Sequence, residues 1–360
     1  MEAPIYELPK ILRDLLGGYA CNLPPKFLVF PRDVGPSDVQ DFLVGSILLN
    51  AHLHSYPASE QYQYIFWKGM RYSISALDVV MLISQLGCKD IELDSRIYEG
   101  YISLMPTTAS QQNAGMALPK PSYITYFWLD SSRSQYERCT LLESRKLIED
   151  GTTGLTTWPA SMVLAQYLTS NADFIEGKSA LELGCGIGLL GMVIATMQSR
   201  RTAASTLCLT DVRPDVLQRC EENLALECNA SSSHPSLTCR LLDWTDALER
   251  QTVQTVHDLL AEVEPELIVG ADIVFDPVII PALVATLAIC LTGRKTLAFL
   301  ALTVRNATTI AEFLRATREV LTMEEIMFDP GESMFAGTSG KTTVHEVKIF
   351  RIGYSQITSK

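Results

Sequence analysis

The chain has 360 residues, 47% of them hydrophobic and 19% charged, which suffices for one large or two ordinary globular domains and excludes a disordered chain. Its net charge of −12 argues against a general nucleic-acid binder, because such proteins usually carry a basic surface. Nine cysteines without a Cys-x-x-Cys pair, and a start unlike a signal peptide, indicate a cytoplasmic protein without a metal site.

The first predicted part of the chain, residues 1–104, is mostly helical. Ser37 and Ser75 each precede an apolar-periodic run, which is the pattern of a helix capped at its N-terminus. Residues 105–122 are polar and rich in proline and glycine, so we expect a linker there. This division predicts a mainly helical N-terminal region over 1–122 and a second domain over 123–360.

The second domain is predicted to begin with a hairpin, because 123–129 and 136–142 are rich in β-forming residues and joined by a polar stretch. The segment Gly151-Thr-Thr-Gly-Leu-Thr-Thr-Trp-Pro159 then leads into a helix over 160–169. Trp158 in this segment can close over a bound ligand. By composition alone, the segment fits a loop that only caps the helix as well as it fits a ligand-binding role.

From residue 179 onward, strand and helix patterns alternate, which is typical of a mainly parallel, doubly wound sheet. The apolar run 278–291 contains Pro281 and is too short to span a bilayer, so we expect a buried helix and no membrane contact. The predicted strands are 179–183, 206–210, 237–242, 267–271 and 296–302, followed by 323–328 and 343–350 with no helix between the last two. Two consecutive strands joined by a loop are normally antiparallel, so an antiparallel hairpin should close the sheet.

The stretch Ala180-Leu-Glu-Leu-Gly-Cys-Gly-Ile-Gly188 combines a buried strand with a glycine-rich turn, at the end of a strand where open α/β sheets bind ligands. Its glycines allow a sharp turn and a close approach of ligand to backbone. Glu182 would repel a diphosphate but suits a cationic ligand such as S-adenosylmethionine. Residues 186–191 also match the G-x-G-x-x-G pattern of dinucleotide sites, so a nicotinamide or flavin enzyme stays open on this stretch alone.

Polar residues also follow the next strands of the predicted sheet. Asp211 ends the second strand, where its carboxylate can accept hydrogen bonds from ribose hydroxyls, and it equally fits an N-cap for the helix near Pro214. Asp243 and Trp244 follow the third strand, where they can bind the amino group of an adenine and stack on its ring. Large aromatic side chains are usually buried, so a tryptophan in this loop favours a binding role.

The fourth strand ends at Ala271 and Asp272. A carboxylate there would face the methyl donor and can hold an incoming lysine ammonium behind the methyl group. Asp272 can instead cap the helix after Pro277, although Asp276 is better placed for that. The terminal hairpin and the positions of Glu182 and Trp244 favour a methyl-donor site over a dinucleotide site.

Together these motifs resemble the family 16 protein-lysine methyltransferases, over residues 136–351. Within that family, the Gly-Thr-Thr-Gly-Leu element before Trp158 is most similar to the lysine methyltransferases of eukaryotic elongation factor 2. The resemblance implies a seven-stranded, Rossmann-like, S-adenosylmethionine-dependent methyltransferase fold. The cofactor contacts that it implies come from Trp158, Gly184, Cys185, Gly186, Asp211, Trp244 and Ala271, and the residue types at the strand ends add Glu182 and Asp243.

On the substrate side, the resemblance implies a catalytic role for Asp272 and Phe275. The family's Asp-x-x-Tyr signature appears here as Asp272-Ile-Val-Phe275, which keeps an aromatic wall but loses a hydroxyl. The family also implies a protein substrate, elongation factor 2. The length of the N-terminal region and the linker at 105–122 lead us to expect that this region recognises the substrate. A methyltransferase for another protein or a small molecule, and a non-catalytic module that keeps the cofactor fold, are the alternatives.

Overall fold

A computed structural model describes residues 8–31, 33–75, 94–105, 120–130, 135–146, 149, 151–200, 205–292, 295–338 and 346–354. The chain divides into two compact units. Unit 1 comprises Met1–Lys146 and Met334–Lys341, and unit 2 comprises Leu147–Ser333 and Thr342–Lys360. The hairpin after residue 122 therefore groups with unit 1, whereas the sequence analysis placed it in the second domain.

Unit 2 is a seven-stranded sheet in the order β5-β4-β3-β6-β7-β9-β8. The first five strands in this order are parallel, and β9 pairs antiparallel with both β7 and β8. This confirms the expected parallel sheet with an antiparallel closing hairpin. The strands are β3 (Ala180–Leu183), β4 (Leu207–Asp211), β5 (Leu237–Leu241), β6 (Leu267–Ala271), β7 (Leu297–Thr303), β8 (Thr322–Ile326) and β9 (Val347–Gly353).

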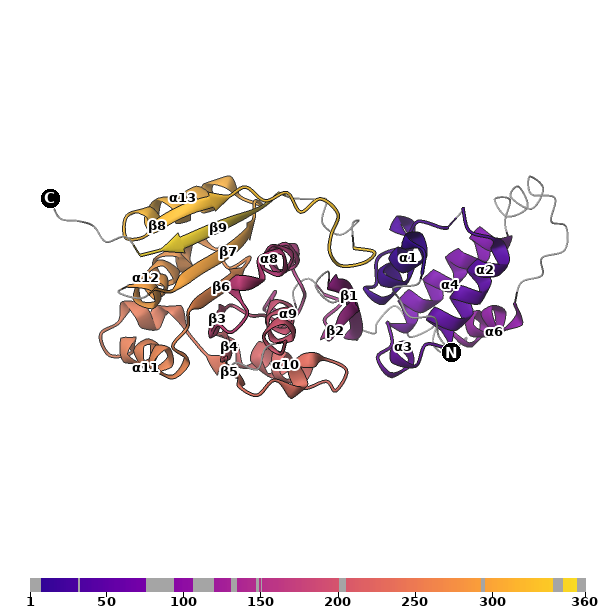
Figure 1. Cartoon of the computed structure of the whole chain (residues 1–360), viewed down its shortest axis with the longest axis horizontal. Coiled ribbons are helices and arrows are strands. Elements are labelled where there is room, and N and C mark those ends of the chain that lie inside the picture. Colours follow the sequence, from indigo (N-terminus) through magenta and orange to yellow (C-terminus); the bar gives the residue numbers. More distant parts are fainter. Residues whose placement is uncertain are drawn as a thin grey trace. The chain divides into compact units, whose positions relative to one another are not determined.

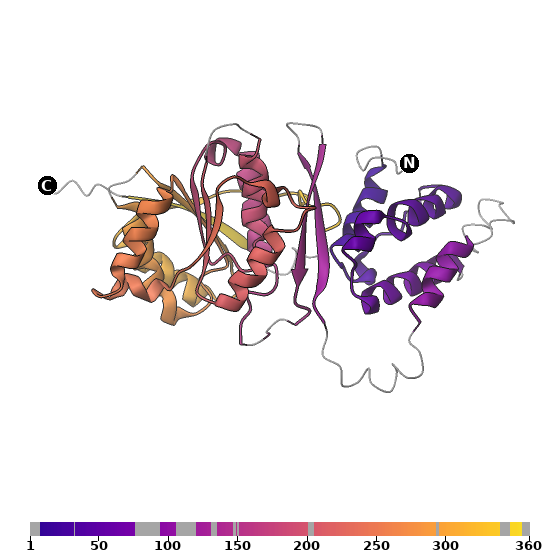
Figure 2. The ribbon, with the colours of Figure 1, turned by 90° about the horizontal axis from the view of Figure 1, so that it is seen from below.

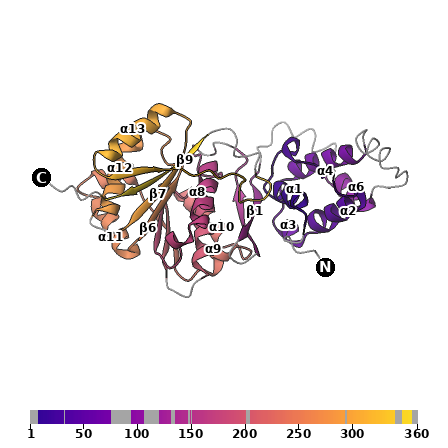
Figure 3. The ribbon, with the colours of Figure 1, turned by 45° about the horizontal axis from the view of Figure 1, so that its top comes forward.

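Helices cover both faces of this sheet, with α8, α9 and α10 on one side and α11, α12 and α13 on the other (Figure 1). The α-helices are α8 (Pro159–Ser170), α9 (Leu189–Gln198), α10 (Pro214–Leu224), α11 (Val253–Val263), α12 (Ile280–Leu291) and α13 (Ala307–Arg318). Short 3-10 helices are η4 (Ala172–Phe174), η5 (Ala230–Ser233), η6 (Trp244–Leu248) and η7 (Pro277–Ile279). The view in Figure 3 shows the same separation of the two helix layers.

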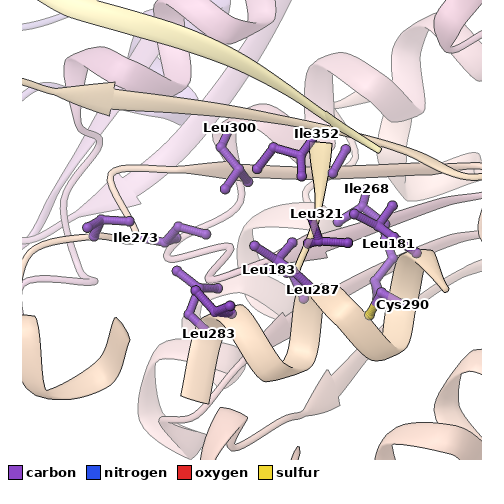
Figure 4. Close-up of a cluster of buried hydrophobic side chains, with 14 of the residues drawn as sticks. Leu181, Leu183, Ile268, Ile273, Leu283, Leu287, Cys290, Leu300, Leu321 and Ile352 are labelled. Carbon is purple, nitrogen blue, oxygen red and sulfur yellow. The ribbon is translucent and has the colours of Figure 1, made fainter. Parts of the chain in front are cut away.

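The central strands are mostly apolar and buried because both faces are covered. All four residues of β3 are buried, as is typical of parallel strands between two helix layers. Leu181 of β3, Leu300 of β7 and Ile352 of β9 pack with Leu283 and Leu287 of α12 in one core cluster (Figure 4). The parallel pairing of β5, β4, β3 and β6 brings their carboxyl ends to one edge of the sheet.

Unit 1 combines helices with a two-stranded sheet. Its helices are α1 (Lys10–Ala20), η2 (Pro25–Phe27), α2 (Pro36–Phe42), the π-helix η3 (Leu43–Leu48), α3 (Ala51–Ser55), α4 (Glu60–Ser75) and α6 (Ser95–Ser103). The predicted helix at Ser37 corresponds to α2 and η3, but its N-cap residue is Gly35, and Ser37 lies within the helix. Ser75 is the last described residue of α4 and not an N-cap, and the helix predicted to follow it lies outside the described residues. The predicted linker also lies mostly outside them, over 106–119.

The hairpin of unit 1 joins β1 (Ser122–Asp130) and β2 (Gln135–Glu143) in antiparallel register. Figure 2 shows it as a long ribbon beside the helices of unit 1. The connection between β8 and β9 supplies the last piece of this unit, because Phe335 bridges Trp128 in antiparallel fashion. None of the helices in the described part of the chain has the length and apolar composition needed to cross a bilayer.

Candidate functional site

A cavity of about 480 Å³ opens at the carboxyl ends of β3, β4, β5 and β6 in unit 2. The parallel strands bring these ends together, which is where open α/β sheets bind ligands. Every site residue predicted from the sequence lines this cavity: Trp158, Glu182, Gly184, Cys185, Gly186, Asp211, Asp243, Trp244, Ala271, Asp272 and Phe275. Their individual roles stay predictions. The structure also shows what holds each one in place.

The turn between β3 and α9 is a backbone surface that only glycine permits. Gly184, Gly186 and Gly188 have φ angles of 67°, 52° and 96°. A Cβ on Gly184 would lie 2.7 Å from Cγ2 of Ile273, and one on Gly186 would lie 3.1 Å from the carbonyl oxygen of Gly154. A side chain at either position would therefore strain the turn and narrow the cavity.

Asp211 at the end of β4 holds this turn. Its Oδ2 accepts a hydrogen bond from the backbone N–H of Gly186 at 3.2 Å, and its Oδ1 accepts from that of Arg213 at 3.1 Å. Burial raises the pKa of Asp211 above its ordinary value. Arg213, not Asp211, is the N-cap residue of α10, and α10 has no side-chain cap. Asp211 thus orders the glycine turn while keeping its place on the cavity wall.

Glu182 lies beneath the turn instead of at its surface. Its side chain is 2% exposed, and its Oε2 has no hydrogen-bond partner among the described residues. Burial raises the pKa of this carboxyl well above its ordinary value. A Cβ on Gly191 of α9 would lie 2.9 Å from that oxygen, so the carboxyl is directed toward the helix start.

Asp243 and Trp244 form the wall that follows β5. Asp243 caps η6, because its Oδ1 accepts from the backbone N–H of Thr245 at 2.9 Å and from its hydroxyl at 2.7 Å. The half-buried Trp244 packs against the core cluster of unit 2, and a Cβ on Gly184 would lie 3.7 Å from its Cζ2. The cap and the core contact fix the indole beside the glycine turn.

Asp272 sits at the turn from β6 into the loop 272–276, with a φ of 55° that few non-glycine residues adopt. Its carboxylate accepts from the backbone N–H of Thr303 at 2.7 Å, from the Thr303 hydroxyl at 2.8 Å and from Nη2 of Arg305 at 3.0 Å. An incoming ammonium would therefore meet a carboxylate that already has three donors. Asp276 accepts from the backbone N–H of Val278 and caps η7. This confirms the expectation that Asp276, and not Asp272, caps the helix at Pro277.

Thr303 and Arg305 are the neighbours that the sequence analysis missed. Both lie at or just beyond the carboxyl end of β7, so the rule that identified the other positions would also have selected them. The guanidinium carbon of Arg305 lies 4.3 Å from the centroid of the Trp158 ring. The indole N–H of Trp158 donates to the carbonyl oxygen of Thr153 at 3.0 Å. Trp158 is thus held by its own loop and by a cation from the strand end.

Phe275 completes the rim, because its side chain is 65% exposed beside the cavity. A large aromatic group in this position is available to a molecule that approaches from solvent. Within the described residues, no group of three or more His, Cys, Asp or Glu side chains is arranged to hold a metal ion.

Comparisons with known proteins show what this chain is similar to. A family model described as lysine methyltransferase matches residues 141–319. Human protein-lysine N-methyltransferase EEF2KMT is 35% identical over 184 residues, covering 48% of this chain and 52% of that protein. Protein-lysine N-methyltransferase EFM3 of Chaetomium thermophilum is 32% identical over 175 residues, covering 46% of this chain and 47% of that protein. The chain spans about half the length of these curated relatives.

Among solved structures, a SAM-dependent O-methyltransferase from Thermotoga maritima aligns with a TM-score of 0.35 and 11% sequence identity. The alignment covers 67% of this chain and 95% of that chain.

Proposed function

We propose that this chain, whose residues 141–319 match the lysine methyltransferase family model, is an S-adenosylmethionine-dependent protein-lysine N-methyltransferase acting on elongation factor 2. One observation carries the proposal. The glycine turn, four carboxylates and two tryptophans converge on a single cavity at the carboxyl ends of four strands. Such a set suits a ligand that has an adenosine part and a cationic part.

The residues present fit S-adenosylmethionine. Asp211 can accept hydrogen bonds from ribose hydroxyls, and Asp243 with Trp244 offers an acceptor and an aromatic face to adenine. The bare backbone of the glycine turn leaves room for the ligand between them. The unpartnered Oε2 of Glu182 is a buried acceptor that an amino group or a water would satisfy. When bound, the cofactor supplies an electrophilic methyl group, and the protein supplies alignment.

The substrate side is proposed to be the rim formed by Phe275 and the loop that Asp272 anchors. The exposed ring of Phe275 offers a face for a methylated ammonium, a contact that contributes about 0.5–2 kcal/mol. A lysine must lose its proton before it attacks, which costs roughly 4–5 kcal/mol at neutral pH for an ordinary pKa of about 10.4. The positive charge of Arg305 does not lower the pKa of the amine by itself, because it is paired with Asp272, whereas desolvation of the lysine at the rim lowers that pKa.

Two observations support elongation factor 2 as the substrate: the Gly-Thr-Thr-Gly-Leu element and the similarity to human EEF2KMT. Unit 1 is proposed to recognise that protein. In unit 1, Phe27 at the end of η2 and Val29 just beyond it are 50% and 67% exposed. Exposed apolar side chains on a loop are typical of contact surfaces.

The proposal is tested by incubating the protein with purified, unmodified elongation factor 2 and methyl-labelled S-adenosylmethionine. We expect label in the elongation factor band and methyl-lysine after acid hydrolysis. In a parallel incubation with fractionated lysate, label in another protein would change the substrate assignment, and label only in small molecules would contradict a protein substrate. A protein that binds the cofactor but labels nothing would be the non-catalytic module.

The role of unit 1 is tested by the double variant Phe27→Ser, Val29→Ser. We expect a raised KM for elongation factor 2 and an unchanged affinity for S-adenosylhomocysteine, because these side chains lie in the other unit from the cavity. Ile102→Ser, an exposed apolar residue of α6 in the same unit, is the matched control. An equal effect of both variants on KM would argue against recognition through this segment.

A further inference from the structure

Arg305 connects two walls of the cavity without lining it. One wall is the segment before α8, which carries Trp158, and the other is the end of β6, which carries Asp272. Nη2 of Arg305 lies 3.0 Å from Oδ2 of Asp272, and its guanidinium carbon lies 4.3 Å from the centroid of the Trp158 ring. The Arg305 side chain is 38% exposed, whereas that of Asp272 is 7% exposed.

Asp272 and Trp158 have separate anchors of their own. Thr303 holds the carboxylate with two hydrogen bonds, and the carbonyl oxygen of Thr153 holds the indole N–H. These anchors orient each group within its own segment. The guanidinium of Arg305 contacts both the Asp272 carboxylate and the Trp158 indole, and so links the two segments. A planar guanidinium suits this geometry, since it can bind a carboxylate at its edge while an aromatic ring stacks on its face.

We propose that Arg305 is a positioning residue that fixes the Trp158 indole relative to the Asp272 loop at the rim of the methyl-donor cavity. The inference rests on the proposed function for what the cavity binds, but not for the clamp itself. With the clamp in place, the Trp158 segment stays closed toward the cavity and the loop with Phe275 keeps its position. Loss of the clamp frees the indole to move, so donor affinity and the turnover of bound substrate should fall together.

The clamp is tested by Arg305→Gln and Arg305→Lys, with Arg315→Gln as the matched control. Arg315 is an exposed arginine of α13 that pairs with Glu319 at 2.6 Å, and it does not line the cavity. Lysine keeps a positive charge for Asp272 but has no planar face for the indole. The Lys variant also preserves the test if the Gln variant folds poorly.

The first readout is acrylamide quenching of tryptophan fluorescence. Of the four tryptophans, Trp67 and Trp128 are buried, so quenching reports mainly Trp158 and Trp244. We expect Arg305→Gln and Arg305→Lys to increase quenching, and Trp158→Phe to remove that difference. Arg315→Gln should match the wild type. Unchanged quenching in both Arg305 variants would overturn the clamp, as would an increase that persists in the Trp158→Phe background.

The second readout is the dissociation constant for S-adenosylhomocysteine. We expect it to rise by about tenfold in Arg305→Gln and by less in Arg305→Lys, as fits the loss of a cation–π contact and a partly exposed ion pair. An unchanged constant in Arg305→Gln would refute the effect on the donor site. Failure of the wild type to bind this probe would instead count against the proposed function, while the quenching experiment would still decide on the clamp.

Discussion

Phe335 offers a sharp test of how unit 1 is built, because this residue comes from the connection between β8 and β9 of the unit 2 sheet. The ring is 0% exposed, and its centroid lies 5.6 Å from that of Tyr126 and 5.8 Å from that of Trp128 in edge-to-face geometry. The next residue, Ala336, donates its backbone N–H to the carbonyl oxygen of Phe127 at 2.8 Å. The segment thus extends the hairpin and supplies part of the core of unit 1.

Phe335→Ala should destabilise unit 1 by about 4 kcal/mol. Truncation of a buried phenylalanine costs about 3–5 kcal/mol, and that range includes the two aromatic contacts, which contribute about 0.5–1.5 kcal/mol each. For a unit of about 150 residues, this corresponds to a fall in Tm of roughly 8–16 °C.

Differential scanning calorimetry measures this change, and hydrogen exchange of residues 122–143 assigns it to unit 1. The control is Phe27→Ala in the same unit, whose ring is 50% exposed, and we expect it to cost under about 1 kcal/mol. Similar Tm values for the two variants, or a fall below about 3 °C for Phe335→Ala, would refute the claim that this ring anchors the segment.

Three further predictions concern the cavity. In Glu182→Gln, the free energy of unfolding should rise relative to wild type as the pH increases above about 4.5. Because its pKa is raised, Glu182 keeps its proton in the folded wild type at pH values where the unfolded chain has lost it, so wild-type stability falls over that range. Urea denaturation at several pH values measures both proteins. A constant difference in the free energy of unfolding between variant and wild type would contradict this prediction. Trp244→Ala should weaken S-adenosylhomocysteine binding by about 1–3 kcal/mol in calorimetric titration, and unchanged binding would remove the tryptophan from the adenine site. Asp272→Asn should lower methyl transfer to elongation factor 2 because it weakens the contacts with Thr303 and Arg305, and a wild-type rate would exclude a role for this carboxylate.

Much of unit 2 was predictable from the sequence for a simple reason. Parallel strands that are buried on both faces give nearly continuous apolar runs, and their carboxyl ends must meet at one edge of the sheet. Residues as far apart as Gly184 and Asp272 could therefore be assigned to one cavity, whereas the assignment of Trp158 and Phe275 depended on the family resemblance. The absence of a helix pattern between the last two strands likewise predicted the antiparallel closure.

The partners of the site residues could not be predicted because they depend on contacts between distant segments. Asp272 is bound by Thr303, 31 positions later in the chain, and no local pattern indicates that its carboxylate is already occupied. The direction of the Glu182 side chain depends on how α9 packs over the turn. Similarly, a Gly- and Ser-rich loop between two strands gives no sign that Phe335 belongs to the core of the other unit.

The most direct test of the central claim is the intact mass of purified, unmodified elongation factor 2 after incubation with this protein and S-adenosylmethionine. We predict a mass increase of one or more whole methyl groups, located on a lysine by peptide sequencing and lost when the donor is omitted. An unchanged mass, from a preparation of this protein that binds S-adenosylhomocysteine, would contradict the proposed activity on elongation factor 2.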